Sequence, residues 1–171
     1  MPHLHLSLQA GSDMILKRMK RRHSRAEGLA AIARARGLRP GLGIGADLIA
    51  GFPTETDELF AETLAMVEEA AIPFLHVFPY SERPGTPAAR MPSVPKPVRK
   101  ERAARLREAS GRAAVAYYAG LVGQRVSVLS ETGMAGHTEH FAPVRLVAPA
   151  GVVVTATVTG ADAAGLLAEA A

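Results

Sequence analysis

One acidic side chain interrupts a short apolar run in the segment GADLIAGFPTET, which covers residues 45–56. The run predicts a strand buried on both faces of a parallel sheet, then a turn at Gly51 and the start of a helix. A lone carboxylate in such a strand is costly to bury unless it is paired or reaches solvent or a ligand. Asp47, at a strand–helix junction, is placed to accept hydrogen bonds from ribose hydroxyls. The alternative is a structural Asp enclosed at the end of the strand.

The segment HLHLSLQ at residues 3–9 alternates strictly between polar and apolar side chains, which predicts a strand. Its polar face carries His3, His5, Ser7 and Gln9, so Ser7 and Gln9 are placed to face whatever lies inside the fold. His76 falls on a further predicted strand. We interpret the three histidines as core or lining residues, not metal ligands, because the sequence shows no carboxylate or cysteine cluster around them.

Basic side chains gather in two segments of the chain. Six lysines and arginines fall within residues 17–25, and seven fall within residues 96–112. Such clusters suit a polyanion such as RNA. The alternative is that each is the solvated face of a helix.

The bulk composition restricts the class of protein. The chain has 171 residues, a net charge of +4 and 48% apolar residues, which is enough for a domain plus a small module. No apolar run approaches the roughly 20 residues of a membrane span, and no secretory signal is visible. The absence of cysteine excludes disulfides, thiolate zinc sites and iron–sulfur clusters held by this chain's own thiolates. We therefore expect a cytoplasmic protein without a membrane partner.

The first 80 residues predict an α/β arrangement with right-handed crossovers. Ser24 and Glu27 form a capping-box pattern that opens a helix ending at Gly37. The predicted order is strand 3–9, a short helix from residue 13, helix 25–36, strand 41–50, helix 57–71 and strand 73–80.

The rest of the chain changes character. A proline-rich connection over residues 81–97 precedes a long helix at 98–121. Strands at 124–130, 140–147 and 152–159, with a turn at 133–136, predict a small β-barrel. We divide the chain into residues 1–95, 96–121 and 122–171, and the fold class is α/β plus all-β. Three parallel strands do not complete an α/β domain, so we expect a C-terminal part of a longer protein.

Four motifs in this order resemble the radical-SAM methylthiotransferases over nearly the whole chain. They are HLSLQAGSD with LKRMKRR, then DLIAGFPTET, HVFPYSERPGTPAA and GHTEHFAPVRL. The pairing of HVFPYS with GHTEHF is most similar to the branch that modifies threonylcarbamoyladenosine in tRNA, and the isopentenyladenosine branch comes second. The motifs also leave open a ribosomal-protein methylthiotransferase, and the basic segments leave open a non-catalytic RNA-binding module.

The resemblance implies the last three strands of a radical-SAM (βα) half-barrel, a connecting helix and a C-terminal TRAM-like β-barrel. It implies S-adenosylmethionine (SAM) as cofactor and two 4Fe–4S clusters, for which all six cysteine ligands are missing here. It also implies addition of a methylthio group to carbon 2 of a modified adenosine next to the anticodon. The partners would be the anticodon stem-loop of tRNA and the missing N-terminal half of the protein. No catalytic residue falls in this chain, which we expect to be inactive alone.

The resemblance also implies the site residues. The expected SAM-binding residues are Ser7, Gln9, Arg21, Asp47, Gly51, Phe52 and Pro53. The expected substrate- or RNA-binding residues are Tyr80, Ser81, Arg83, His137, Thr138, Glu139, Phe141 and Arg145. For Tyr80 the alternative is a buried hydroxyl with a local partner, and for Phe141 it is a place in the barrel core.

Overall fold

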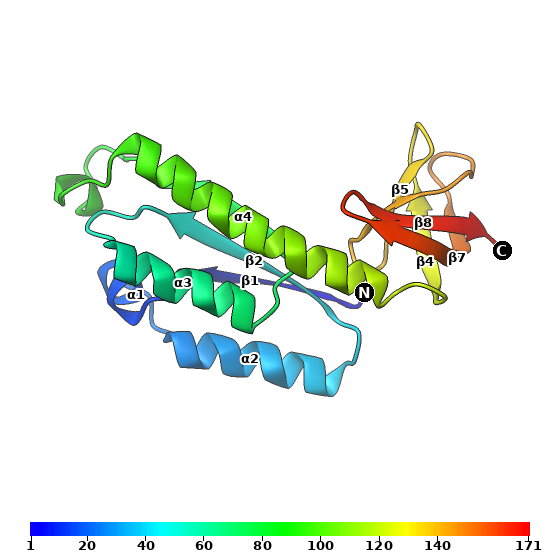
Figure 1. Cartoon of the computed structure of the whole chain (residues 1–171), viewed down its shortest axis with the longest axis horizontal. Helices are drawn as coiled ribbons and strands as arrows, with labels where there is room; N and C mark the ends of the chain where they lie inside the picture. Colours follow the sequence, from blue (N-terminus) through cyan, green and yellow to red (C-terminus); the bar gives the residue numbers. More distant parts are fainter.

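A long helix, α4 (Lys96–Ala119), runs between the two parts of the molecule (Figure 1). The computed structural model describes all 171 residues. The part before α4 contains β1 (His3–Gln9), α1 (Asp13–Arg18), α2 (Arg25–Leu38), β2 (Gly43–Ala50), α3 (Asp57–Glu69), β3 (Phe74–Pro79) and the short 3-10 helix η1 (Ala88–Arg90). No helix is both long and apolar enough to cross a membrane.

The first part is a parallel sheet in the order β1-β2-β3, covered by helices on one face only (Figure 1). The side chains of β2 alternate accordingly: Ile44, Ala46 and Leu48 are buried beneath α2, α3 and α4. Asp47 and Ile49 point to the other face and are only half-buried. The prediction of an α/β layer is confirmed, but the prediction that this strand is buried on both faces is wrong.

Helix ends follow local sequence where a cap is present. The predicted capping box at Ser24 and Glu27 forms and starts α2 at Arg25. Gly37 does not end that helix, which continues to Leu38, and the left-handed backbone occurs instead at Gly41, with φ of +78°. At α1 the N-cap position is Ser12, but its hydroxyl makes no capping bond.

The second part is a closed five-stranded barrel in the order β4-β5-β6-β8-β7. Its strands are β4 (Arg125–Ser130), β5 (Ala135–Thr138), β6 (Pro143–Arg145), β7 (Val153–Asp162) and β8 (Gly165–Ala170). The barrel is confirmed, but β5 begins inside the predicted turn and β6 is much shorter than predicted. The hydroxyl of Thr138 accepts the main-chain N–H groups of His140 and Ala142, which closes a turn where a strand was expected.

The two parts meet at the carboxyl end of α4. Tyr118, near the end of the helix, is buried in the barrel core. The Nδ1 of His3, at the start of β1, donates to the main-chain oxygen of His140 at 2.9 Å, and its ring packs on Phe141 with 4.8 Å between centroids. Tyr117 donates to the main-chain oxygen of Gly41 at 2.9 Å. The sheet and the barrel are therefore in direct contact.

Candidate functional site

The carboxyl ends of the three parallel strands form two adjoining recesses, the usual place for a ligand on such a sheet. The larger has a volume of about 510 Å³, the smaller about 340 Å³, and both include Gln9 and Ile49. The larger is also lined by Asp47, Phe78, Pro79, Tyr80, Ser81 and Arg83. The smaller is also lined by Arg18, Met19, Lys20, Arg21, Phe52, Thr86, Pro87 and Ala88. The structure thus brings together predicted residues from four separate segments of the chain.

Asp47 lies between two histidines on the open face of the sheet. The Nε2 of His5 donates to Asp47 Oδ1 at 2.9 Å, and the Nδ1 of His76 lies 3.4 Å from the same oxygen. The hydroxyl of Ser7 donates to Oδ2 at 3.5 Å. The hydrogen bond from His5 holds the pKa of the Asp47 carboxyl below its ordinary value, despite an opposing effect of burial. Asp47 is therefore an ionised, partly exposed acceptor.

The prediction that no carboxylate lies near the strand histidines is wrong. His5 on β1 and His76 on β3 reach Asp47 from either side because their strands flank β2. Gly45 makes room for the His5 ring, since a Cβ at this position would overlap that ring. Sequence alternation places His5 on the polar face, but it does not reveal which residue of β2 lies beside it.

Gln9 ends β1 in a conformation that side chains rarely adopt. Its φ is +69°, the pairing register between β1 and β2 shifts just before it, and the residue is 8% exposed. Such strain persists only where the surrounding structure enforces it, and it is common at binding sites. The side chain lines both recesses.

Arg21 is placed at the smaller recess by the end of α1. The N–H of Arg21 bonds to Leu16 O and that of Lys20 to Lys17 O, while Lys20 has a φ of +57°. This pair of bonds is a Schellman motif, here built without glycine. The guanidinium of Arg21 remains exposed and makes no ion pair within the chain.

The turn after β2 is fixed by a buried ion pair that sequence reasoning missed. Glu55 Oε1 accepts the main-chain N–H of Gly51 at 3.1 Å and the guanidinium of Arg102, on α4, at 2.9 Å. The side chains of Glu55 and Arg102 are 1% and 5% exposed. Burial raises the pKa of Glu55 even though Arg102 opposes the shift. The pair therefore fixes the position of the turn at a cost in desolvation.

Within this turn, Phe52 and Pro53 are both buried, but only Phe52 lines a recess. Gly51 has a φ of +72°, and a Cβ there would lie 2.5 Å from Cγ of Arg99. Helix α4 therefore approaches Gly51 closely, from one side of the turn. Phe52 packs edge-on against Tyr80, with 5.3 Å between ring centroids.

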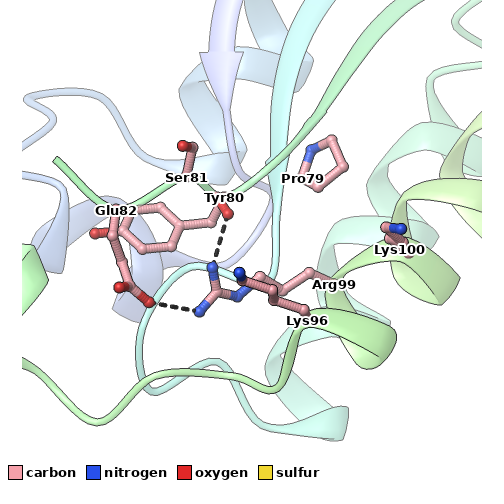
Figure 2. A pocket seen from close by; sticks show the side chains of 7 residues that line it. All are labelled: Pro79, Tyr80, Ser81, Glu82, Lys96, Arg99 and Lys100. Atoms are coloured by element: carbon pink, nitrogen blue, oxygen red, sulfur yellow. Dashed lines mark hydrogen bonds and ion pairs between the residues drawn. The ribbon is translucent and has the colours of Figure 1, made fainter.

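A third cavity of about 360 Å³ opens beside the end of β3, between that strand and the start of α4 (Figure 2). Arg99 spans its floor, donating to the main-chain oxygen of Tyr80 and to the carboxylate of Glu82, each at 2.9 Å. Lys96 and Lys100 complete its basic wall (Figure 2). The hydroxyl of Tyr80 is buried with no hydrogen-bond partner, so the alternative of a local partner is wrong.

The barrel, which carries the predicted RNA-binding residues His137 and Arg145, lies at the other end of α4 from the recesses (Figure 1). His137 is exposed beside Glu131, with 3.1 Å between Nδ1 and Oε1. Arg145 pairs with Asp162 on the surface. The structure does not bring these residues together with the site at the sheet.

Three other barrel residues have structural contacts. Thr138 is 4% exposed and closes a turn, so its hydroxyl does not face solvent. Glu139 accepts the main-chain N–H of Ser127 at 2.8 Å. Phe141 is 51% exposed and packs on His3, so it is not part of the barrel core.

Comparisons with known proteins agree on one family. Residues 1–67 match the sequence model of the Radical SAM superfamily. The chain is 53% identical over 146 residues to threonylcarbamoyladenosine tRNA methylthiotransferase MtaB of Rickettsia prowazekii. The aligned region covers 85% of this chain and 35% of that protein. It is 46% identical to tRNA-2-methylthio-N(6)-dimethylallyladenosine synthase of Methylococcus capsulatus, over 75% of this chain and 28% of that protein.

A solved structure shows a similar fold. The chain superposes on coproporphyrinogen III oxidase (HemN) of Escherichia coli, a radical SAM enzyme, with a TM-score of 0.51 and 27% identity. That match covers 64% of this chain and 27% of the enzyme. The chain spans about a third of the length of the curated relatives it matches.

Proposed function

The chain belongs to the radical-SAM methylthiotransferase family, and we propose that it forms part of an enzyme that adds a methylthio group to a tRNA adenosine. The 53% identity to a tRNA methylthiotransferase over 85% of the chain carries this proposal. The modified position is carbon 2 of an adenosine next to the anticodon, already modified with a threonylcarbamoyl group. Because the chain spans a third of its relatives' length, the activity belongs to a longer protein.

In this proposal the recesses at the sheet hold SAM. The carboxylate of Asp47 accepts hydrogen bonds from the ribose hydroxyls, and the amide of Gln9 also bonds to these hydroxyls. The hydroxyl of Ser7 orients Asp47. The free guanidinium of Arg21 binds the methionine carboxylate, a pairing for which its planar fork is suited. Gly51, Phe52 and Pro53 shape the adenine end. The polar side chains of Asp47, Gln9 and Arg21 fit the polar groups of SAM. SAM supplies the radical precursor when bound.

The residues present do not fit an iron–sulfur cluster. The chain has no cysteine, and thiolates are the ligands that hold such clusters. We therefore assign no chemical step to residues of this chain. Its proposed role is to bind and orient SAM and tRNA, and the cluster ligands belong to an N-terminal partner segment.

The proposed tRNA contacts lie at both ends of the molecule. Tyr80, Ser81 and Arg83 face the larger recess, where the target nucleoside would approach SAM. Arg83 gives this recess a cation that complements the carboxylate of a threonylcarbamoyl group, and an apolar dimethylallyl group offers no such pairing. The barrel, proposed to be a TRAM domain, contacts the stem through its exposed His137 and Arg145.

Titration calorimetry of SAM into the 171-residue chain tests the cofactor site. We expect Asp47→Ala to weaken SAM binding about 10-fold or more, because a charge-assisted hydrogen bond is worth about 1.5–3 kcal/mol. Asp162→Ala is the matched control, since this carboxylate lies in the barrel. Equal affinity of the wild-type chain and Asp47→Ala would remove Asp47 from the site.

Binding of anticodon stem-loops tests the substrate. We expect tighter binding of the stem-loop with threonylcarbamoyladenosine than of the one with dimethylallyladenosine, and Arg83→Gln should remove the difference. Salt-sensitive RNA binding without SAM binding would instead indicate a non-catalytic RNA-binding module. No measurable binding of either stem-loop would favour a protein substrate.

A further inference from the structure

We propose that His5, Asp47 and His76 form a binding site for one divalent transition-metal ion on the open face of the sheet. The three side chains come from the adjacent strands β1, β2 and β3. Each offers one ligand atom, and these atoms all lie within 4.8 Å of one another. The inference is independent of the proposed function, because it concerns metal binding by these three side chains alone.

The distances match those of a shared ion. Zinc binds imidazole nitrogen and carboxylate oxygen at about 2.0–2.2 Å, so neighbouring ligands lie about 3.3–3.6 Å apart around a tetrahedral ion and about 2.8–3.1 Å apart around an octahedral one. Asp47 Oδ1 lies 2.9 Å from His5 Nε2 and 3.4 Å from His76 Nδ1. Only the distance between the two histidine nitrogens must shorten, and the His5 and His76 side chains, 32% and 66% exposed, both reach the surface.

The backbone holds the ligands in place. Asp47 pairs directly with His76 in the β2–β3 register, so their side chains leave the same face of the sheet side by side. His5 pairs with Gly45, and the lack of a side chain there lets its imidazole reach across β2 toward Asp47. Ser7 bonds to Oδ2 of Asp47, which leaves Oδ1 directed at the two histidines. Such support of a ligating carboxylate is typical of metal sites.

The ligand set selects the class of ion. Two imidazoles and one carboxylate suit Zn²⁺, Fe²⁺, Co²⁺ or Ni²⁺, whereas Mg²⁺ and Ca²⁺ prefer oxygen ligands. Three protein ligands leave at least one coordination position for water or an anionic group. Asp47 also lines the 510 Å³ recess, so this open position is next to the place where a ligand would bind.

Titration calorimetry with Zn²⁺ alone, on the untagged 171-residue chain, tests the site. Visible absorption of bound Co²⁺ provides an independent readout of the coordination. We expect one ion per chain, and at least 10-fold weaker binding for each of His5→Ala, Asp47→Asn and His76→Ala. His137→Ala is the matched control, because this histidine sits beside a carboxylate, Glu131, in the barrel. Circular dichroism of each variant reports whether it is folded.

Three results would overturn the proposal. They are the absence of stoichiometric Zn²⁺ binding, unchanged binding in the folded His76→Ala variant, and loss of binding in His137→Ala. The proposed function assigns the same Asp47 carboxylate to SAM, so the titration is run without SAM. Failure to bind Zn²⁺ therefore leaves the SAM proposal standing, and failure to bind SAM leaves the metal proposal standing.

Discussion

Replacing Arg102 by methionine should destabilise the protein far more than the same change at an exposed arginine of α4. The variant leaves the carboxylate of Glu55, which is 1% exposed, without its cationic partner. Breaking a buried ion pair by removing one member costs about 3–5 kcal/mol, because the remaining charge stays desolvated. The additional bond from Arg102 to Asp57 adds little, since the Asp57 side chain is 91% exposed.

The matched control is Arg112→Met. Arg112 lies on the same helix and pairs with Glu68 and Glu108, but its side chain is 58% exposed. Exposed ion pairs contribute about 0–1 kcal/mol, so this variant should remain close to the wild-type chain. Urea unfolding followed by circular dichroism measures both. With a slope of about 1–3 kcal/mol per molar urea, Arg102→Met should lower the midpoint by more than about 1 M.

A double variant separates the buried charge from lost packing. In Glu55→Gln with Arg102→Met, the Gln oxygen still accepts the N–H of Gly51, but no charge is buried. We expect the double variant to recover at least about 1 kcal/mol of the loss seen with Arg102→Met. If Arg102→Met costs no more than Arg112→Met, or if the double variant recovers nothing, the reasoning is refuted.

The pH dependence gives a second check on the same pair. Burial raises the pKa of Glu55, so the native state binds its proton at a higher pH than the unfolded chain does. Lowering the pH through this window therefore favours the native state. Loss of Arg102 raises the pKa of Glu55 further, so the penalty of Arg102→Met should shrink between pH 7 and about pH 5.

Two further predictions concern the turn at Gly51 and the junction at His140. Gly51→Ala should lower the free energy of unfolding by about 1–3 kcal/mol, because the φ of Gly51 is positive and Arg99 occupies the place of a Cβ. Gly111→Ala in α4 is the control: its Cβ meets no atom, so the change should raise the free energy of unfolding by about 0.5–1 kcal/mol. Urea unfolding measures both. Equal effects of the two changes would contradict this. Burial lowers the pKa of His140, so the unfolded chain takes up this proton at a higher pH than the native state does. Stability should therefore fall as the pH drops below about 6.5. His140→Gln should reduce that fall in Tm between pH 7.5 and 5.5, and an unchanged pH profile would count against it.

Elements with a strong local signal could be predicted from the sequence. Strand β1 follows from strict alternation, and the start of α2 follows from its capping box. Strand β8 could not be predicted, because its sequence GLLAEA favours a helix and becomes a strand only by pairing with β6 and β7. The turn around His140 likewise depends on the hydroxyl of Thr138, which alternation does not reveal.

The candidate site shows the same division. Asp47 stands out in the sequence because it is a charge in an apolar run. Its neighbours His5 and His76 do not, because they lie 42 and 29 positions away and meet it only through strand order and register. Glu55 and Arg102 are separated by 47 positions and join a turn to a helix from another segment. Single residues of the site could therefore be identified from the sequence, but their partners were set by tertiary structure.

Helix α4 fixes the distance between the recesses and the barrel. Its 24 residues span about 36 Å, and its two ends are anchored by Arg102 at the turn and by Tyr118 in the barrel. One inserted residue would rotate the barrel by about 100° around the helix axis and move it by about 1.5 Å. Insertions of about seven or about eleven residues, close to two or three full turns, would turn the barrel back to nearly its original direction. The length of this helix thus sets which side of the barrel is turned toward the recesses of the sheet.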